Sequence, residues 1–324
     1  MNPVKIRSVL IVGSGAIKIG EAGEFDYSTS QAIKALREEG IRTIVVNPNI
    51  ATIHTDTRFA DKIYSVPIKV EFLEDIIAKE RPDGILLGFG GQTALNCGVE
   101  LSEKGLLEKY NLTVLGTSIR SIELADNREL FKKTMLSHGI PVPKSKNASD
   151  LDAATEAARE IGYPVIVRVA YTLGGQGSGV ARNESELRDI VLRGLSYSRI
   201  HQVLVEEYLD KWKEIEYEVM RDQNDNCTIV CNMENLDPMG VHTGDSIVVA
   251  PSQTLTNREY NLLRETGQRV IRALGIIGEC NIQFALDPKS DEYRVIEVNS
   301  RLSRSSAESL SEVRTRSRPT IGSP

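Results

Sequence analysis

The chain has 324 residues, of which 40% are hydrophobic and 26% charged, with 45 acidic side chains against 39 Lys and Arg. This is the composition of an ordinary globular protein, and the length suffices for two domains. The net charge of −6 argues against sequence-independent binding of nucleic acid, because affinity for a phosphate backbone depends on a surplus of basic residues. No apolar run approaches the ~20 residues of a membrane-spanning helix, which argues against a membrane protein.

The start of the chain and its cysteines indicate a compartment. The first residues enter an apolar strand pattern without the long apolar region and cleavage site of a secretory signal. The four cysteines have neither zinc-site nor disulfide-framework spacing. We therefore expect a cytoplasmic protein with reduced thiols.

The first 120 residues alternate short β-branched runs with longer segments of helical periodicity. This pattern predicts strands at 8–12, 43–47, 62–66, 84–88 and 113–116, and helices within 28–40 and 70–80. Strands that alternate with helices form a parallel sheet with helices on both faces. We expect a Rossmann-like α/β domain over residues 1–126.

A glycine-rich turn follows the first predicted strand. Gly13 and Gly15 match the start of a dinucleotide-binding motif, but Lys18 stands at its third glycine position. The second strand ends at Asn47 without the acidic residue that a ribose would need. The spacing favours a tight strand-to-helix turn without NAD.

A second domain is expected over residues 127–307, with an α+β fold. Helices are predicted at 128–139, 150–163 and 258–274, and strands at 165–170, 203–209, 215–222, 227–234, 246–252, 280–286 and 293–299. The middle of this domain is expected to be poor in helices. The last residues, 308–324, are polar and without periodicity, which predicts a disordered tail.

The segment 172–179, TLGGQGSG, follows a predicted strand. A loop rich in glycine can close over a triphosphate and offer its backbone N–H groups. A flexible hairpin turn is an equally good interpretation, and the sequence alone does not decide between them.

Three polar residues near the end of the second domain indicate a metal site. Gln283 lies in one predicted strand, and Glu297 and Asn299 lie in another, where residues i and i+2 share a face. Hard oxygen ligands suit Mg²⁺, which takes one or two carboxylates together with substrate phosphates. Arg301 and Arg304 follow at once, as expected where a polyphosphate binds. By contrast, most of the acidic residues between Glu206 and Glu218 are expected on a solvated face.

Several longer strings can be compared with known families. GSGAIKIGEAGEFDYSTSQAIKALREEGI, FGGQTALN, RVAYTLGGQGSG, GVHTGDSIVVAPSQTL, GECNIQFA and VIEVNSRLSRSSA together resemble the start of the large chain of carbamoyl-phosphate synthase, an ATP-grasp ligase. The resemblance covers residues 7–307. It implies a pre-ATP-grasp domain followed by an ATP-grasp domain.

The resemblance also implies an activity, cofactors and partners. In that family this half of the large chain phosphorylates bicarbonate with ATP, and ammonia then arrives from a glutamine amidotransferase subunit or domain. A second half of the large chain phosphorylates the carbamate. The implied cofactors are ATP and Mg²⁺ or Mn²⁺, with K⁺ near Asn235, Asp237 and Ser246. The pathway, arginine or pyrimidine biosynthesis, is left open.

The resemblance assigns roles to particular positions. Arg301 and Arg304 would act on the transferring phosphoryl group and bicarbonate, and Gln283, Glu297 and Asn299 would bind the metal. The nucleotide would contact a larger set, namely Arg128, Arg168, Gly174, Gly175, Glu207, Leu209, Glu214, Gly240, Val241, His242, Gln283 and Glu297.

The family pattern stops at about residue 307, where an apolar helix would follow in relatives. We therefore expect a truncated chain that does not complete carbamoyl phosphate synthesis alone. Two alternatives to a working enzyme unit are a catalytically silent ATP-binding fragment and an NAD-dependent oxidoreductase. The second rests only on the turn at Gly13 and Gly15.

Overall fold

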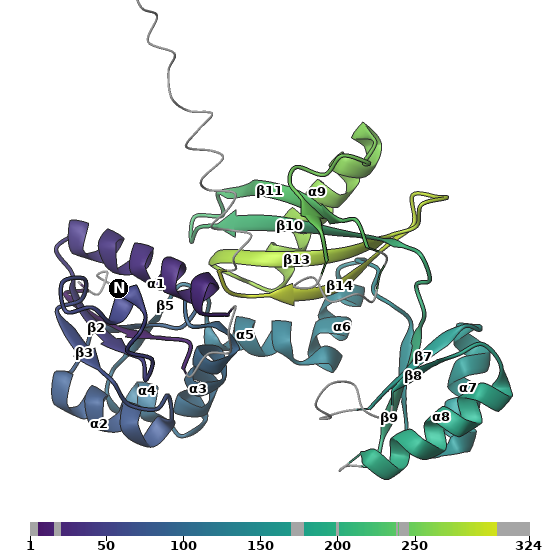
Figure 1. The fold of residues 1–324 in the computed structure, drawn as a ribbon, viewed down its shortest axis with the longest axis horizontal. Coiled ribbons are helices and arrows are strands. Elements are labelled where there is room, and N and C mark those ends of the chain that lie inside the picture. The colour runs from purple at the N-terminus through teal and green to yellow at the C-terminus, as the bar shows by residue number, and fades with distance from the viewer. Residues whose placement is uncertain are drawn as a thin grey trace, which may run out of the picture.

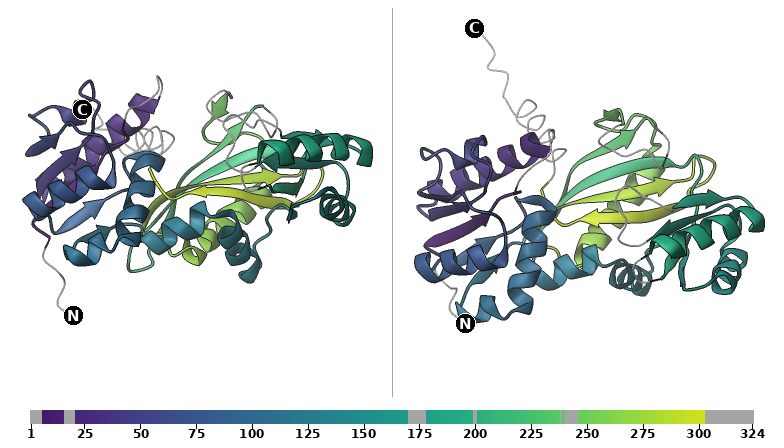
Figure 2. Two further views of the ribbon diagram at one scale, coloured as in Figure 1. Left: turned by 90° about the horizontal axis from the view of Figure 1, so that it is seen from below. Right: turned by 60° about the horizontal axis from the view of Figure 1, so that its bottom comes forward.

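The computed structural model describes residues 6–15, 21–169, 178–198, 201–237, 239 and 246–302. Three sheets and the helices that cover them follow one another along the long axis of the molecule (Figure 1). The two views of Figure 2 place the N-terminal sheet at one end, a small helix-covered sheet at the other and a long antiparallel sheet between them. Within these ranges, no helix combines the length and apolar character needed to cross a bilayer.

The N-terminal sheet is parallel, with the order β3-β2-β1-β4-β5. Its strands are β1 (Ser8–Val12), β2 (Arg42–Val46), β3 (Lys62–Tyr64), β4 (Gly84–Leu86) and β5 (Thr113–Leu115). Its helices are α1 (Glu21–Glu38), α2 (Val70–Glu80), α3 (Gly91–Glu103), α4 (Leu106–Lys109) and α5 (Ile119–Asp126), with a 3₁₀ turn, η1, at Ile53–Thr55. All five strands were predicted, and the Rossmann-like class is confirmed.

Helices cover both faces of this sheet, which explains the nearly continuous apolar runs in β1 and β2. Val9 and Ile11 of β1 pack toward Ile33 of α1. Leu10 and Val12, on the other face, belong to the core formed with α2 and α3. Both sets are buried, as the alternation of side chains along a strand requires.

The turn after β1 is closed by Asn47, at the end of β2. The Gly15 N–H donates to the Asn47 side-chain oxygen at 2.9 Å. A Cβ on Gly13 would lie only 2.8 Å from side-chain carbons of Asn47, so glycine is needed there for close approach. Asn47 therefore accepts the hydrogen bond of a turn N–H that would otherwise be free to bind a dinucleotide phosphate.

The long antiparallel sheet has the order β12-β11-β10-β13-β14. Its strands are β10 (Lys213–Arg221), β11 (Cys227–Asn235), β12 (Val248–Val249), β13 (Gly278–Leu286) and β14 (Tyr293–Asn299). The helices α6 (Arg128–Ser137) and α9 (Asn257–Ala273) contribute to its apolar core, which includes Ile215, Tyr217 and Phe284. The predicted strand 246–252 is reduced to the two residues of β12, because only these pair with β11.

The small sheet has the order β6-β9-β7-β8. Its strands are β6 (Ser145–Ala148), β7 (Val165–Val169), β8 (Gly179–Ala181) and β9 (Val203–Glu207), and its helices are α7 (Leu151–Ile161) and α8 (Glu184–Tyr197). The expectation of a helix-poor middle was wrong here, because α8 lies between β8 and β9. Asn183 caps this helix by accepting the N–H of Glu186.

Candidate nucleotide and metal site

One face of the long sheet is polar and the other is apolar. Along β10, Ile215, Tyr217 and Val219 enter the core, so Glu214, Glu216 and Glu218 lie on the opposite face. These three carboxylates are only 5%, 3% and 0% exposed. The expectation of a solvated face was therefore wrong for them, because β10 is the central strand of the sheet. The Asn281 amide donates to Glu216 at 2.8 Å and to Glu218 at 2.9 Å.

The three predicted metal ligands lie on this polar face. Gln283 of β13 and Glu297 of β14 are direct register partners, and Asn299 is opposite Asn281. The Asn299 amide nitrogen lies 3.2 Å from a carboxylate oxygen of Glu297. Strand pairing thus brings together residues that the sequence separates by 14 positions, 283 to 297.

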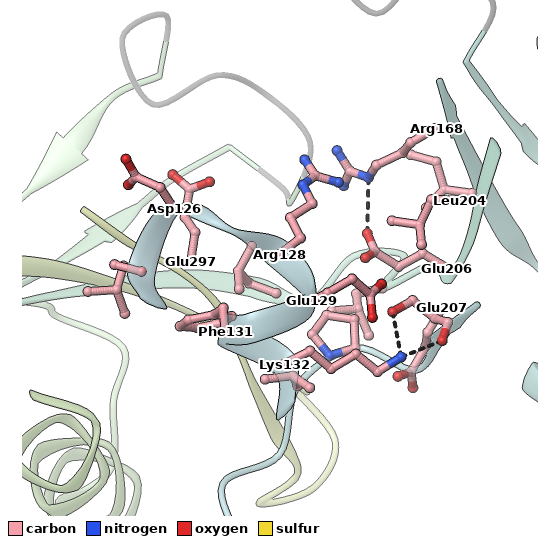
Figure 3. Close-up of a pocket in the computed structure, with 18 of the residues that line it drawn as sticks. Asp126, Arg128, Glu129, Phe131, Lys132, Arg168, Leu204, Glu206, Glu207 and Glu297 are labelled. Carbon is pink, nitrogen blue, oxygen red and sulfur yellow. Dashed lines mark hydrogen bonds and ion pairs between the residues drawn. The ribbon is translucent and has the colours of Figure 1, made fainter. Parts of the chain in front are cut away.

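A pocket of about 350 Å³ lies between the two antiparallel sheets and α6 (Figure 3). Its lining includes six of the predicted site residues, namely Arg128, Arg168, Glu207, Leu209, Glu297 and Asn299. The small sheet presents Ile166, Arg168, Leu204 and Glu206 to this pocket, whereas the alternate residues enter the core under α7 and α8. The pocket therefore uses the face of the small sheet that its helices leave open.

Two guanidinium groups lie at one side of the pocket. Arg128 is the first residue of α6, whose N-terminus is capped by the Asn127 side chain. Arg168 comes from β7, and its Nε donates to Glu206 at 3.0 Å. The side chains of Arg128 and Arg168 point toward one another in Figure 3. Paired guanidinium groups suit a polyphosphate.

Another part of the pocket lining is formed by the chain that follows β9. Leu209 is buried and Tyr208 also lines the pocket. The Glu207 carboxylate accepts the backbone N–H of Lys144 at 3.1 Å and the guanidinium of Arg294 at 3.2 Å. Glu214 does not line the pocket; it lies in β10, opposite Ala285 and Asn235.

The N-terminal unit adds a carboxylate that the sequence did not single out. Asp126, the last residue of α5, lines the pocket, and its side chain lies beside that of Glu297 (Figure 3). Gln92 of α3 donates to it at 2.5 Å. Burial raises the pKa of Asp126, and nearby Glu297 raises it further, whereas Gln92 and Arg301 oppose the shift. Gln92 belongs to the string FGGQTALN, which indicates the family but does not point to Asp126.

Arg301 lies where the long sheet meets the N-terminal unit. Its guanidinium is 5.8 Å from the ring centroid of Phe25 in α1. The backbone N–H of Leu302 donates to the carbonyl of Gly88 at 3.0 Å. Contacts from the first unit therefore position Arg301.

The remaining predicted contacts cannot be placed in this geometry. Gly174, Gly175, Gly240, Val241, His242 and Arg304 lie outside the described residues, as do the predicted tail and most of the glycine-rich segment. Of the residues implied for K⁺, Asp237 accepts the Ser246 hydroxyl at 2.9 Å. Asn235, close to Asp237 in the sequence, is the last residue of β11 and is buried.

The donor set near Glu297 can be tested against the needs of Mg²⁺. Among the described ranges, no cluster of three or more His, Cys, Asp or Glu could hold a metal by itself. Mg²⁺ does not require such a cluster when phosphate oxygens complete its coordination. Glu297 and Asn299 line the pocket together with two arginines, and Gln283, outside the lining, is the register partner of Glu297. One carboxylate with these two side-chain amides fits a metal bound together with a polyphosphate.

Comparison with solved structures gives the class of the fold. Biotin carboxylase from Campylobacter jejuni, solved as a β-γ-ATP complex, superposes with a TM-score of 0.74 and 21% identity, over 95% of this chain and 68% of that one. The order of a parallel-sheet unit and two antiparallel sheets around one pocket defines the ATP-grasp class.

Comparison with protein families is more specific. Residues 5–124 match the carbamoyl phosphate synthase preATP-grasp domain, and residues 127–315 match the ATP binding domain of the carbamoyl-phosphate synthase L chain. The chain belongs to the carbamoyl-phosphate synthase large-chain family. The second match runs past residue 307, the end of the motifs recognised in the sequence.

Two relatives show how much of a large chain is represented. The arginine-specific mitochondrial large chain of Neurospora crassa is 57% identical over 304 residues, which are 94% of this chain and 26% of the relative. The large chain of Pyrococcus furiosus is 59% identical over 304 residues, 94% of this chain and 29% of the relative. The chain thus spans between a quarter and a third of the length of these two relatives.

Proposed function

We propose that this chain binds ATP with Mg²⁺ or Mn²⁺ and phosphorylates bicarbonate to carboxyphosphate, the first step of carbamoyl phosphate synthesis. Family membership and the match to an ATP binding domain support this proposal. One structural observation carries it. Glu297 and Asn299 on β14 enter the same pocket as Arg128 and Arg168, so sites for a metal and for a polyphosphate coincide.

The residues have separate tasks in this reaction. Arg128 and Arg168 hold the phosphate chain. Glu207 and Leu209, which the family resemblance assigns to the adenine pocket, form the base end of the site. Gln283, Glu297 and Asn299 would hold the metal, which supplies charge neutralisation of the phosphates when bound. Arg301, placed by Phe25, orients bicarbonate and the transferring phosphoryl group.

The chemistry needs positioning more than a covalent nucleophile. A bicarbonate oxygen forms a bond to the γ-phosphorus while the bond from that phosphorus to the bridging oxygen breaks. The electron pair of the broken bond leaves with ADP, and carboxyphosphate remains. Bicarbonate is already an anion at neutral pH, so no general base is required.

The whole synthase would need further parts. We propose that ammonia comes from a glutamine amidotransferase subunit or domain, and that carbamate is phosphorylated by a second half of the large chain. We also propose K⁺ binding near Asp237 and Ser246, where an acidic side chain and a hydroxyl already meet. The residues outside the described ranges that the family resemblance names, including His242 and Arg304, are part of this proposal.

The test is phosphate release from ATP, measured with and without bicarbonate. The wild-type chain should show release that bicarbonate stimulates, and Glu297→Ala should lower it by at least tenfold, since one interaction with the transferring group is typically worth 10²–10³-fold. Glu265→Ala is the matched control, because Glu265 lies on α9, which covers the opposite face of the sheet. It should behave as wild type.

Two outcomes would change the proposal. If MgATP raises the melting temperature but no bicarbonate-dependent release appears, the chain is a binding module without catalysis. If the folded wild-type chain does not bind MgATP at all, the proposed function is wrong.

A further inference from the structure

Arg294 lies outside the pocket, yet it links the two sheets that enclose it. It is the second residue of β14, in the long sheet, and it contacts Glu207, the last residue of β9 in the small sheet. Its Nε lies 3.2 Å from one carboxylate oxygen of Glu207, and its Nη2 lies 3.2 Å from the other. The pairing is therefore bidentate, which fixes the orientation of both side chains as well as their distance.

The surroundings of this pair shield it from water. The side chains of Arg294 and Glu207 are only 14% and 20% exposed. The guanidinium also lies 5.4 Å from the ring centroid of Trp212, the single tryptophan of the chain. An exposed ion pair contributes little to structure, whereas a shielded, bidentate and stacked pair holds a defined geometry.

A β-bulge in β14 explains why Arg294 reaches the pocket side of the sheet. Arg294 and Glu297 are three positions apart, so a regular strand would place them on opposite faces. The register shifts between Gln283 and Phe284, so that Glu297 pairs with Gln283 and Val295 with Phe284. One extra residue, Ile296, is thereby inserted, and Arg294 shares the face of Glu297.

The same strand thus contacts both ends of the pocket. Glu297 and Asn299 belong to its metal end, and Arg294 holds Glu207, which begins the segment at its base end. We propose that Arg294 is a positioning residue that fixes the segment from Glu207 to Leu209 against β14. The base of ATP can then occupy its site while the phosphates occupy theirs. This inference rests on the proposed function, since it assigns the base end of the same site.

The proposal predicts a selective loss of affinity. Arg294→Gln removes the bidentate pair and should weaken MgATP binding about tenfold, as loss of one charge-assisted contact does. Magnesium tripolyphosphate, which occupies only the phosphate and metal end, should bind with unchanged affinity. Arg294→Lys keeps the charge without the planar fork and should give an intermediate affinity for MgATP. Calorimetric titration of the full chain measures all of these affinities.

Arg258→Gln is the matched control. Arg258 pairs with Asp291 at 2.7 Å, but the two side chains are 79% and 42% exposed and lie outside the pocket. This variant should bind both ligands as wild type does.

The remaining outcomes overturn the inference. Equal weakening of both ligands in the Arg294 variants would indicate a general loss of structure, and unchanged MgATP binding would show that the pair has no role at the site. If the wild-type chain binds neither ligand, the proposed function fails and this inference fails with it.

Discussion

His54 is a fully buried imidazole within the N-terminal unit. Its Nδ1 lies 2.8 Å from Asp26 of α1, and its Nε2 lies 2.9 Å from the Asn47 amide that also closes the turn after β1. Thr52 is the other polar neighbour, at 3.5 Å. Burial lowers the pKa of His54 from 6.5, and the hydrogen bond and charge of Asp26 only partly oppose that shift.

This burial predicts a dependence of stability on pH. The unfolded chain takes up a proton on this imidazole near pH 6.5, whereas the folded chain does so only at lower pH. The unfolded state therefore binds more protons below about pH 6.5, and the free energy of unfolding falls as the pH drops through this region. The melting temperature of the wild-type chain should decrease between pH 7.5 and 5.5, and His54→Gln should reduce that decrease.

His138→Gln is the control for this measurement, because His138 is exposed at the end of α6. It should keep the full pH dependence of the wild-type chain. An identical pH dependence in His54→Gln and wild type would show that His54 does not contribute.

The site residues differ in how far the sequence could predict them. Glu297 and Asn299 could be predicted, because residues i and i+2 of one strand share a face whatever the rest of the fold does. Asp126 and Arg294 could not. Asp126 reaches the pocket only because α5 of the first unit ends beside β14, and Arg294 only because a bulge reverses the parity of its strand.

At the scale of elements, the local sequence pattern was sufficient to predict most of the strands. The strands β1 and β2 of the parallel sheet are apolar and buried over nearly their whole length, and β14 was predicted with its observed bounds. The burial of the acidic residues in β10 could not be predicted. An alternation of apolar and acidic residues is equally compatible with an edge strand, where the acidic face is solvated, and with a central strand. Only the pairing of β10 with both β11 and β13 buries Glu216 and Glu218.

The helix α8 was missed although its sequence contains a helical signal. Leu187, Ile190, Val191 and Leu195 follow helical spacing and are buried against the small sheet. Asn183 and Glu186 form the start signal, since Asn183 accepts the N–H of Glu186 and the Glu186 side chain reaches back to the N–H of Arg182. This helix could be predicted from the sequence, and it leaves one face of the small sheet to the pocket.

Helix α9 provides a prediction at the same scale. Thr256 and Glu259 form a capping box at its start: the Glu259 N–H donates to the Thr256 hydroxyl at 3.2 Å, and the Thr256 N–H donates to Glu259 at 2.6 Å. Thr256→Ala should cost about 1 kcal/mol of the free energy of unfolding and lower the melting temperature by about 2 °C. MgATP affinity should not change, because α9 covers the face of the long sheet opposite the pocket.

Thr256→Ser retains the hydroxyl and should preserve most of the stability. A loss in Thr256→Ser equal to that in Thr256→Ala would contradict the capping interpretation. Urea unfolding and MgATP titration on the same samples separate the effect on stability from any effect on the site.

At the scale of the whole molecule, hydrogen bonds join the first unit to the part of the chain that forms the long sheet. The Thr117 hydroxyl donates to the carbonyl of Ile277 at 2.9 Å, and the Ser121 hydroxyl donates to that of Gly275 at 3.0 Å. The backbone hydrogen bond from Leu302 to Gly88 is a further contact of this kind, next to Arg301. We propose the boundary between the two domains at Asn127, which ends α5 and caps α6.

The pocket draws its walls from all three parts of the molecule. Gln92 and Asp126 come from the first unit, Arg168 and Glu206 from the small sheet, and Glu297 and Asn299 from the long sheet. A ligand that contacts all three should therefore restrict their relative motion, and local opening of each part should become rarer when it is bound. A ligand held by only one part would leave the other two unchanged.

Hydrogen exchange with and without MgADP measures this difference. We expect slower exchange at the start of α3 (91–96), at the end of β9 with the following segment (204–209), and in β14 (293–299). The helices α2 and α8 are internal references, because α2 packs on the N-terminal sheet and α8 on the face of the small sheet opposite the pocket. Protection confined to β14, with 91–96 and 204–209 unchanged, would contradict a site built jointly by the three parts.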